Sequence, residues 1–234
     1  MERSRRKGPI MQYEIISEAY PVVVCHLAAG EQMRTERGSM VWMDSWIDMA
    51  TKAGDAGGVL GRMMTGESFF ENVYTAKRPG KIAFGSSFPG RIIPIAIAPG
   101  RDFIVQKQGF LASEMSVELA VHVNQKIGSG VFGGEGFIMQ RLTGCGTAFL
   151  EVDGDLVSYE LAAGEQLTVN TGNVLGFTSG VSLDVRMVRG AMNLIFGGEG
   201  LFNTVLTGPG TVWLQTMPMS TLVDSVLDHI HNKH

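Results

Sequence analysis

The chain has 234 residues, of which 44% are hydrophobic and 18% charged, and its formal net charge is −4 at pH 7. This composition is typical of a folded globular protein and excludes a wholly disordered chain. The acidic balance disfavours binding to nucleic acid, since the one stretch rich in Arg and Lys is confined to residues 3–7.

Residues 1–10 are predicted to be a disordered extension or tag, because the patterned sequence begins only at Met11. No apolar segment follows the basic start, so a signal peptide is not expected. The longest nearly unbroken apolar stretch, Ile92–Ala98, is far shorter than the roughly 20 residues of a membrane-spanning helix.

Cys25 and Cys145 match neither a disulfide framework nor a zinc-binding spacing and indicate a reducing compartment. We therefore expect a cytoplasmic protein without a transmembrane segment.

An internal repeat dominates the sequence. The segment Leu27–Met33 (LAAGEQM) recurs as Leu161–Leu167 (LAAGEQL) and more loosely as Ile97–Phe103 (IAPGRDF). A second motif pairs a Gly-Glu segment with a later Gly-containing turn, in Gly134–Phe137 with Leu142–Gly146, in Gly198–Leu201 with Leu206–Gly210, and in diverged form in Gly66–Phe70 with Tyr74–Gly80. Such fixed spacing is the signature of a repeat architecture.

Alternation with a period of two predicts half-buried strands within the repeats. It is clearest over Met115–Val123 and again over Val181–Met187. Each repeat is too small to bury its own hydrophobic face, so we expect a single all-β domain over residues 11–219. Its three repeats are predicted at about 11–80, 81–146 and 147–219, packed around a pseudo-threefold axis.

Three further elements are predicted in chain order. Trp46–Met64, rich in Met, Gly and Ala, indicates a short helix or a mobile loop. Asp153-Gly154, between Phe149–Val152 and Leu156–Tyr159, predicts a β-hairpin with a type I′ turn. Ser220–Ile230 has an N-cap residue and one apolar stripe, so residues 220–234 are predicted to form a C-terminal helix and tail.

The repeated Leu-Ala-Ala-Gly-Glu, the Gly-Glu-Gly-Phe strand opening and the Leu-Thr-Gly-x-Gly turn resemble an uncharacterised bacterial family related to the altered-inheritance-of-mitochondria proteins. The resemblance spans roughly residues 11–219. That family is similar in fold to the tryptophan RNA-binding attenuator protein (TRAP), so the resemblance implies a TRAP-like β-sandwich of three tandem repeats. Its fungal mitochondrial members are linked to inner-membrane organisation, but this sequence lacks the amphipathic presequence such a member needs. The resemblance supplies no catalytic residues.

Glu67, Glu135 and Glu199 occupy equivalent positions of the three repeats. Carboxylates that meet around a pseudo-axis provide the oxygen ligands that a hard cation prefers, so these residues are candidate metal ligands. The alternative is structural, because a Gly-flanked Glu at the start of a strand commonly accepts hydrogen bonds from turn amides. We favour the structural interpretation.

The remaining candidates also have structural interpretations. Cys145 could present a reactive thiol in its turn, but Pro209 occupies the equivalent position, which favours turn geometry. His122 is expected to be exposed, and His229, His231 and His234 to lie in the tail. The glycine-rich Gly128–Gly134 and Phe196–Gly198 lack the Lys and following helix of a phosphate-binding loop and are interpreted as turns or bulges.

The sequence therefore predicts a noncatalytic binding or scaffold protein that self-associates through sheet edges or through the Met-rich first repeat. The alternative is a small-ligand or RNA-binding protein by analogy of fold with TRAP, and the third hypothesis is a metal-dependent enzyme. No cofactor and no catalytic residue are predicted. A protein partner and peripheral contact with a membrane are left open.

Overall fold

The computed structural model describes residues 11–17, 19–35, 38–53, 70–125, 137–187 and 202–219, together with residues 221 and 223. Over these residues the chain folds into four antiparallel β-sheets, with two 3-10 turns, η1 (Lys107–Gly109) and η2 (Thr171–Asn173). The predicted all-β class is confirmed. Residues 1–10 and almost all of the predicted C-terminal helix lie outside the described residues.

We number the sheets along the molecule. Sheet 1 has the order β1-β2-β7-β4, with strands β1 (Gln12–Ile16), β2 (Val22–Leu27), β7 (Gly80–Gly85) and β4 (Met40–Met43). Sheet 2 consists, in spatial order, of β5 (Ile47–Ala53), β6 (Phe70–Ala76), β3 (Gln32–Thr35), β10 (Phe110–Glu114), β13 (Gly146–Asp153) and β8 (Gly90–Ile97). Sheet 3 consists of β11 (Val117–Gln125), β12 (Phe137–Gly144), β9 (Phe103–Gln106), β16 (Val174–Thr178), β19 (Gly210–Gln215) and β14 (Leu156–Leu161). Sheet 4 consists of β15 (Gln166–Asn170), β18 (Phe202–Thr207) and β17 (Ser182–Met187).

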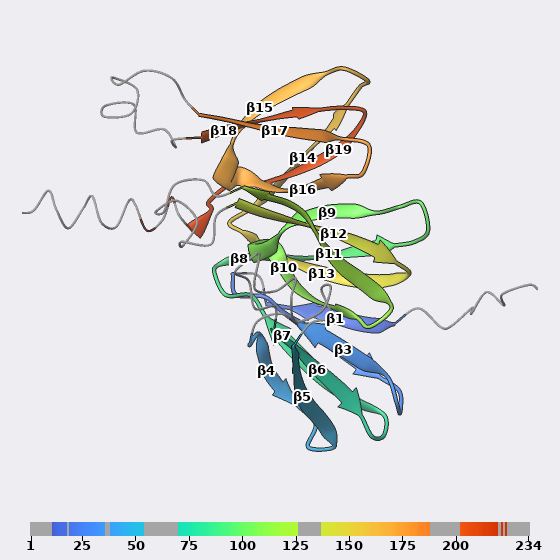
Figure 1. Ribbon diagram of the computed structural model, residues 1–234. Helices are drawn as coiled ribbons and strands as arrows, with labels where there is room; N and C mark the ends of the chain where they lie inside the picture. Colours follow the sequence, from blue (N-terminus) through green and yellow to red (C-terminus); the bar gives the residue numbers. More distant parts are fainter. Residues whose placement is uncertain are drawn as a thin grey trace, which may run out of the picture.

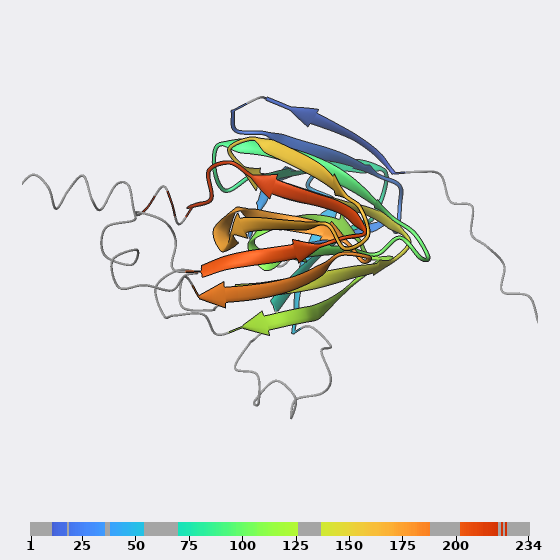
Figure 2. The same ribbon diagram turned by 90° about the horizontal axis from the view of Figure 1, so that it is seen from above.

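Each sheet packs on the next, in the order 1 to 4, and in Figure 1 the strands of sheet 4 lie at the top whereas β4 and β5, of sheets 1 and 2, lie at the bottom. Seen from above, strands of successive sheets run in roughly the same direction (Figure 2), as in aligned sheet packing. A separate hydrophobic cluster fills each of the three spaces between neighbouring sheets. We call these clusters 1, 2 and 3, for the spaces between sheets 1 and 2, sheets 2 and 3, and sheets 3 and 4.

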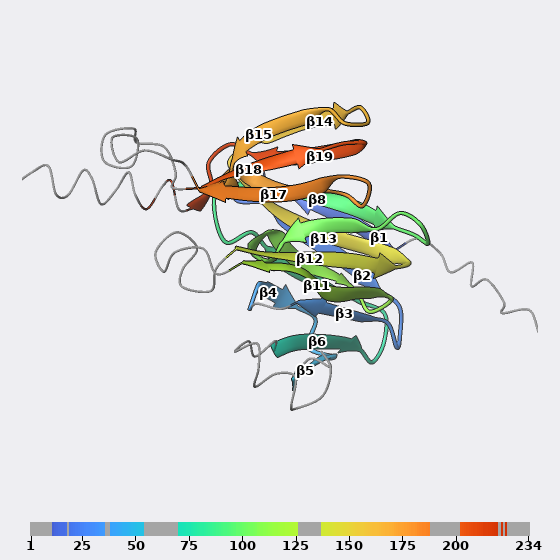
Figure 3. The ribbon, with the colours of Figure 1, turned by 45° about the horizontal axis from the view of Figure 1, so that its top comes forward.

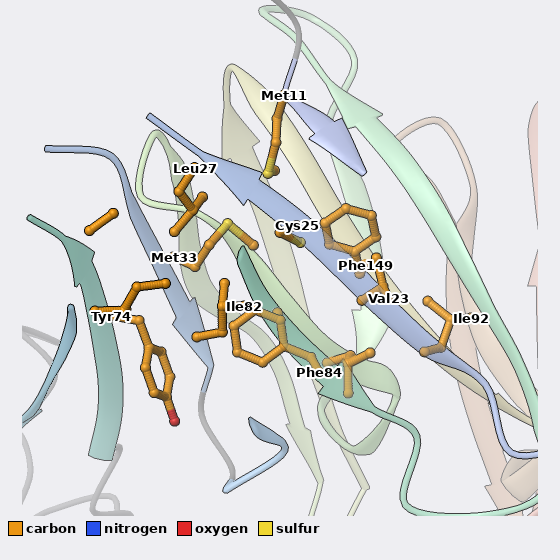
Figure 4. Close-up of a cluster of buried hydrophobic side chains, with 14 residues drawn as sticks. Met11, Val23, Cys25, Leu27, Met33, Tyr74, Ile82, Phe84, Ile92 and Phe149 are labelled. Atoms are coloured by element: carbon orange, nitrogen blue, oxygen red, sulfur yellow. The ribbon is translucent and has the colours of Figure 1, made fainter. Parts of the chain in front are cut away.

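Cluster 1 is drawn in Figure 4. Tyr74 of sheet 2 meets Phe84 of sheet 1 edge to face, with ring centroids 5.6 Å apart. Phe149 of sheet 2 meets Tyr13 of β1 in the same way at 5.0 Å. Such contacts add to the burial of apolar area, which is the main force that holds stacked sheets together.

Strand β13 is covered on both faces. Phe149 packs into cluster 1, whereas Ala148 and Leu150, its neighbours in the sequence, pack into cluster 2. All three side chains are fully buried. The inner sheets therefore join neighbouring clusters, and Ala148, Phe149 and Leu150 are consecutive apolar residues because neither face of the strand meets solvent there.

The structure corrects two local predictions. Ile47–Ala53, within the segment predicted as a helix or loop, is strand β5 and pairs residue by residue with β6, because cross-strand pairing outweighs local propensity. Asp153-Gly154 does not close a hairpin. β13 already pairs with β8 and β10 on its two sides, so β14 joins sheet 3 beside β19. Gly154 does adopt the positive φ, +77°, that the motif favours, and uses it to pass from one sheet to the next.

The predicted alternation of β11 holds in part. Val117 is fully buried and Leu119 half-buried, but Val121 is exposed although its position predicts an inward side chain. A register shift between Val121 and Val123 places a bulge there, and beyond it Val123 packs against cluster 3, whereas Leu119 before it packs against cluster 2.

Candidate functional site: joined and open sheet edges

Glu67, Glu135 and Glu199 lie outside the described residues, as do the glycine-rich Gly128–Gly134 and Phe196–Gly198 and the C-terminal histidines. The cation-site hypothesis therefore stays a prediction. Within the residues that the structure does describe, no group of three or more His, Cys, Asp or Glu side chains is placed to hold a metal ion.

The two cysteines occupy contrasting environments. Cys25 is a buried free thiol in cluster 1, and burial, with a smaller contribution from the charge of Glu114, raises its pKa to about 12. Cys145 is an exposed free thiol in a bend, where its amide donates to the carbonyl of Ser116 at 3.2 Å. Thiolates are the reactive form, so the raised pKa makes Cys25 inert at neutral pH.

His122 is exposed on β11, as predicted. Partial burial, followed by the positive charge of Arg141, lowers its pKa from the ordinary value of a histidine. Both effects favour the neutral imidazole.

The repeated Leu-Ala-Ala-Gly-Glu motif builds a tight turn. Its glycine has φ values of +84°, +78° and +79° in the three copies, at Gly30, Gly100 and Gly164. Open space surrounds each of these glycines, so the left-handed backbone alone, and no crowding, requires glycine there.

The glutamate that follows this glycine stabilises the turn. The carboxylate of Glu31 accepts from the amide of Ala28 at 2.7 Å, and that of Glu165 accepts from the amide of Ala162 at 2.8 Å. Charged groups that accept from turn amides are common structural devices. These two glutamates therefore have local structural roles.

A second repeated hydrogen bond links each of the bulged strands β4, β10 and β16 to its neighbouring strand. One side-chain oxygen just beyond β4, at the end of β10 and at the end of β16 accepts from a backbone amide of the neighbouring strand; the pairs are Asp44 with Lys81 at 2.9 Å, Glu114 with Thr147 at 2.6 Å, and Thr178 with Thr211 at 3.1 Å. Carboxylate and hydroxyl oxygens thus accept the same kind of hydrogen bond at matching positions. What the three positions share is a hydrogen bond to the backbone.

Two edge-to-edge junctions build the six-stranded sheets. In sheet 2, β3 pairs with β10 through Arg34 opposite Ser113 and Met33 opposite Glu114. In sheet 3, β9 pairs with β16 through Ile104 opposite Phe177 and its two neighbours. Each junction joins a short strand that follows the Leu-Ala-Ala-Gly-Glu turn, or its variant, to a short strand that carries a bulge.

Arg34 forms an ion pair and a hydrogen bond at the first junction. Its guanidinium lies 3.1 Å from the carboxylate of Glu71 and donates at 2.8 Å to the carbonyl of Met115, which precedes β11. Only 11% of the Arg34 side chain and 17% of the Glu71 side chain are exposed. Arginine can satisfy two acceptors at once, so this one side chain ties three segments together.

The other ends of the described sheets are open edges, and their side chains differ in charge. Six edge strands carry at least one charged residue: β1 with Glu14, β5 with Asp48 and Lys52, β8 with Arg91, β11 with Glu118, β14 with Glu160, and β17 with Asp184 and Arg186. The other two, β4 (MVWM) and β15 (QLTVN), carry none. Charges on an edge strand discourage pairing with another chain, so β4 and β15 lack this protection.

Apolar side chains are exposed at β4. Val41 is 54% and Trp42 43% exposed, whereas Met40 and Met43 are half-buried against cluster 1. The sequence analysis named the Met-rich first repeat as a possible site of self-association and missed the valine and tryptophan. No signal in residues 40–43 alone marks these side chains as exposed, since a short uncharged apolar run equally predicts a buried strand.

The chain matches the family model described as "Mitochondrial biogenesis AIM24" over residues 13–217. It belongs to this family. The match covers all nineteen strands except the first residue of β1, so the whole stack of sheets is the family domain.

Two similar proteins come from Streptococcus pyogenes. An uncharacterised protein, M6_Spy0233 of serotype M6, is 27% identical over 210 residues, which is 86% of this chain and 83% of the relative. The crystal structure of protein SPYM3_0169 has a TM-score of 0.77 and 24% identity and covers 94% of this chain and 99% of its own, which supports the fold. No specific activity comes with these relatives. The helices that the structure describes include none long and apolar enough to cross a membrane.

Proposed function

We propose that this AIM24-family protein is a noncatalytic scaffold that assembles into a homo-oligomer through its sheet edges. The observation that carries the proposal is the pair of junctions β3–β10 and β9–β16, in which short strands join successive parts of the chain into continuous sheets. A chain that already extends its sheets by edge pairing has the parts needed to extend them further.

The internal architecture that we propose is three tandem TRAP-like β units of six strands. The orders β2-β7-β4, β8-β13-β10 and β14-β19-β16 match one another, as do β5-β6-β3, β11-β12-β9 and β17-β18-β15. Register shifts fall at matching places in β4, β10 and β16. This grouping supports the first two unit boundaries one strand later than the motif spacing predicts, since β7 and β13 pair within the unit that precedes them. The pseudo-threefold relation among the units stays a prediction.

Two features support scaffolding over catalysis. The turn glutamates and strand-end acids within the described residues are engaged by backbone amides, which is a structural use of carboxylates. The largest apolar exposure near an uncharged edge, at Val41 and Trp42, is a surface suited to contact with protein. We place the protein in the cytoplasm, where the free thiols of Cys25 and Cys145 would remain reduced.

Native mass spectrometry of the untreated full-length protein tests this proposal. The expected result is an oligomer whose mass is a whole multiple of the chain mass, with no retained small molecule, metal or nucleic acid. A monomer at every concentration would contradict the self-associating scaffold. An extra mass that a chelator removes would favour the metal hypothesis and Glu67, Glu135 and Glu199, and an extra mass that ribonuclease removes would favour the RNA-binding alternative.

A further inference from the structure

We infer that β15 of one copy pairs antiparallel with β4 of a second copy, so that the protein assembles head to tail. The inference deepens the proposed function and rests on it, because it names the two surfaces through which the scaffold self-associates. The occupant of each open edge is thus the opposite edge of another copy of this chain.

The strand topology leads to this pairing. β3 and β9 follow the first two copies of the turn motif, and each pairs with a strand that carries a bulge, β10 or β16. β15 follows the third copy of the motif, and β4 is the third bulged strand. Among the described strands, β15 pairs with β18 alone and β4 with β7 alone. The two strands that would complete the series are therefore both edge strands with one open side.

The two edges cannot serve each other within one chain. β4 and β15 lie far apart, with β12 and β13 between them, in both Figure 1 and Figure 3. A contact between unlike surfaces of identical chains is heterologous, so it closes into a ring or continues as a filament according to the rotation between copies.

The equivalence also fixes the register. Thr178 lies opposite Phe103 and Phe177 opposite Ile104 at one junction, and Glu114 opposite Met33 at the other. Equivalent positions are found by counting from the turn glycine along one strand and from the bulge along the other. The same register then places Asp44 opposite Leu167, Met43 opposite Thr168 and Trp42 opposite Val169.

The backbone donors point the right way for this register. The carbonyl of Glu165 accepts from the amide of Gly208 on the β18 side, and the amide of Asp44 donates to Lys81 on the β7 side. Alternate residues of an antiparallel strand direct their amides to opposite sides. The amides of Thr168 and Met43 therefore face the open sides, where the proposed register makes them a hydrogen-bonded pair.

The faces of the side chains agree as well. Val169 packs into cluster 3 of its own copy, so Thr168 faces away from that cluster, whereas Met43 faces cluster 1 of its copy. Residues opposite one another in a sheet share a face, and the proposed joined sheet puts Met43 and Thr168 on one face and Trp42 and Val169 on the other. Ile104 and Phe177 share a face in the same way, since both pack into cluster 3.

Charge singles out the same two edges. β4 and β15 are the two edge strands without a charged residue among the eight described. At the joined edges the residue after the bulge is small, Ala112 or Gly176, whereas at β4 it is Trp42. The pairing would cover this ring against Leu167, which is smaller than Phe103 at the matching position of the second junction.

Two proline variants test the pairing in the full chain. Met43→Pro and Thr168→Pro each remove one N–H that faces an open side and leave the ladder bonds to β7 and β18 in place. Their controls, Met43→Leu and Thr168→Val, keep the N–H. Each proline variant should lose the association of the wild type in sedimentation velocity, whereas the controls should retain it. Circular dichroism checks that each variant is folded.

A mixture of the two proline variants gives the sharper readout. Met43→Pro keeps a competent β15 and Thr168→Pro a competent β4, so equal amounts should form a 1:1 heterodimer and nothing larger. Wild-type oligomers together with fully associating proline variants would overturn the edge pairing and leave the scaffold proposal standing. A wild type that stays monomeric would overturn both.

A cross-link covers the case in which a proline variant fails to fold. In a Cys145→Ser background, one chain carries Met43→Cys and another Thr168→Cys, because these positions are opposite one another in the proposed register. Mild oxidation of the mixture should give a disulfide-linked dimer, and each variant alone should not. Equal cross-linking in the separate and mixed samples would overturn the inference.

Discussion

At the first junction Arg34 faces Ser113 across β3 and β10, whereas at the second Ile104 faces Phe177 across β9 and β16. The first junction is held by a largely buried guanidinium that contacts Glu71 and the carbonyl of Met115. The second is held by apolar side chains of cluster 3. The same backbone pairing thus occurs with charged side chains at one junction and apolar side chains at the other. This indicates that backbone hydrogen bonding sets the geometry of a junction, whereas the side chains set how much it contributes to stability.

The largest effect is expected from Arg34→Ala at the first junction. The substitution leaves the Glu71 carboxylate, 17% exposed, without its cation and the Met115 carbonyl without its donor. Removing one partner of a mostly buried pair costs about 2–4 kcal/mol. Urea denaturation measures the loss of unfolding free energy. Arg34→Lys, which keeps the charge and loses the planar fork, should recover part of it. A loss of less than about 0.5 kcal/mol, the range of an ordinary surface substitution, would show that the ion pair does not hold this junction.

A smaller effect is expected from adding one methyl group at the second junction. A Cβ on Gly176 would lie 2.5 Å from the carbonyl oxygen of Ile104 and 2.6 Å from the ring of Phe103. Gly176→Ala should therefore destabilise by about 1–3 kcal/mol, as overpacking does. The matched change at the first junction is the reverse, Ala112→Gly, which should cost about 0.5–1 kcal/mol. The two denaturation midpoints test whether the junctions differ in spacing, and a neutral Gly176→Ala would mean that they do not.

The smallest effect is expected from the ion pair beside the second junction, whose arginine is more exposed than Arg34. Asp102, just before β9, is 16% exposed and lies 2.5 Å from the guanidinium of Arg141, whose side chain is 45% exposed. Asp102→Asn should lower the unfolding free energy by no more than about 1 kcal/mol, and added salt should reduce the difference from the wild type. Measurements at low and high salt on this variant and on Arg34→Ala compare the two pairs. A larger effect at Asp102 than at Arg34 would reverse the contrast between them.

The sequence predicted the all-β class and the turns well because these depend on local signals. Gly30, Gly100 and Gly164 share a left-handed backbone that the repeated motif requires. Strand β5 was missed because its residues favour other structures locally and it forms by pairing with β6. Nothing in residues 40–43 or 166–170 by themselves says that these strands are edges, since the same kind of strand is internal at β10 and β9.

By itself, the sequence determined where the chain turns, how often the pattern repeats and which residues are apolar, since backbone φ preferences and hydrophobic alternation act over a few residues. The tertiary structure decided which strands pair. Asp153-Gly154 reads as a hairpin, yet β13 and β14 enter different sheets because both sides of β13 are already occupied. Tertiary structure alone also showed that β4 and β15 each have a single partner among the described strands and so lie at sheet edges. A strand's partner depends on which edges the rest of the chain leaves free, and that is a property of the whole fold.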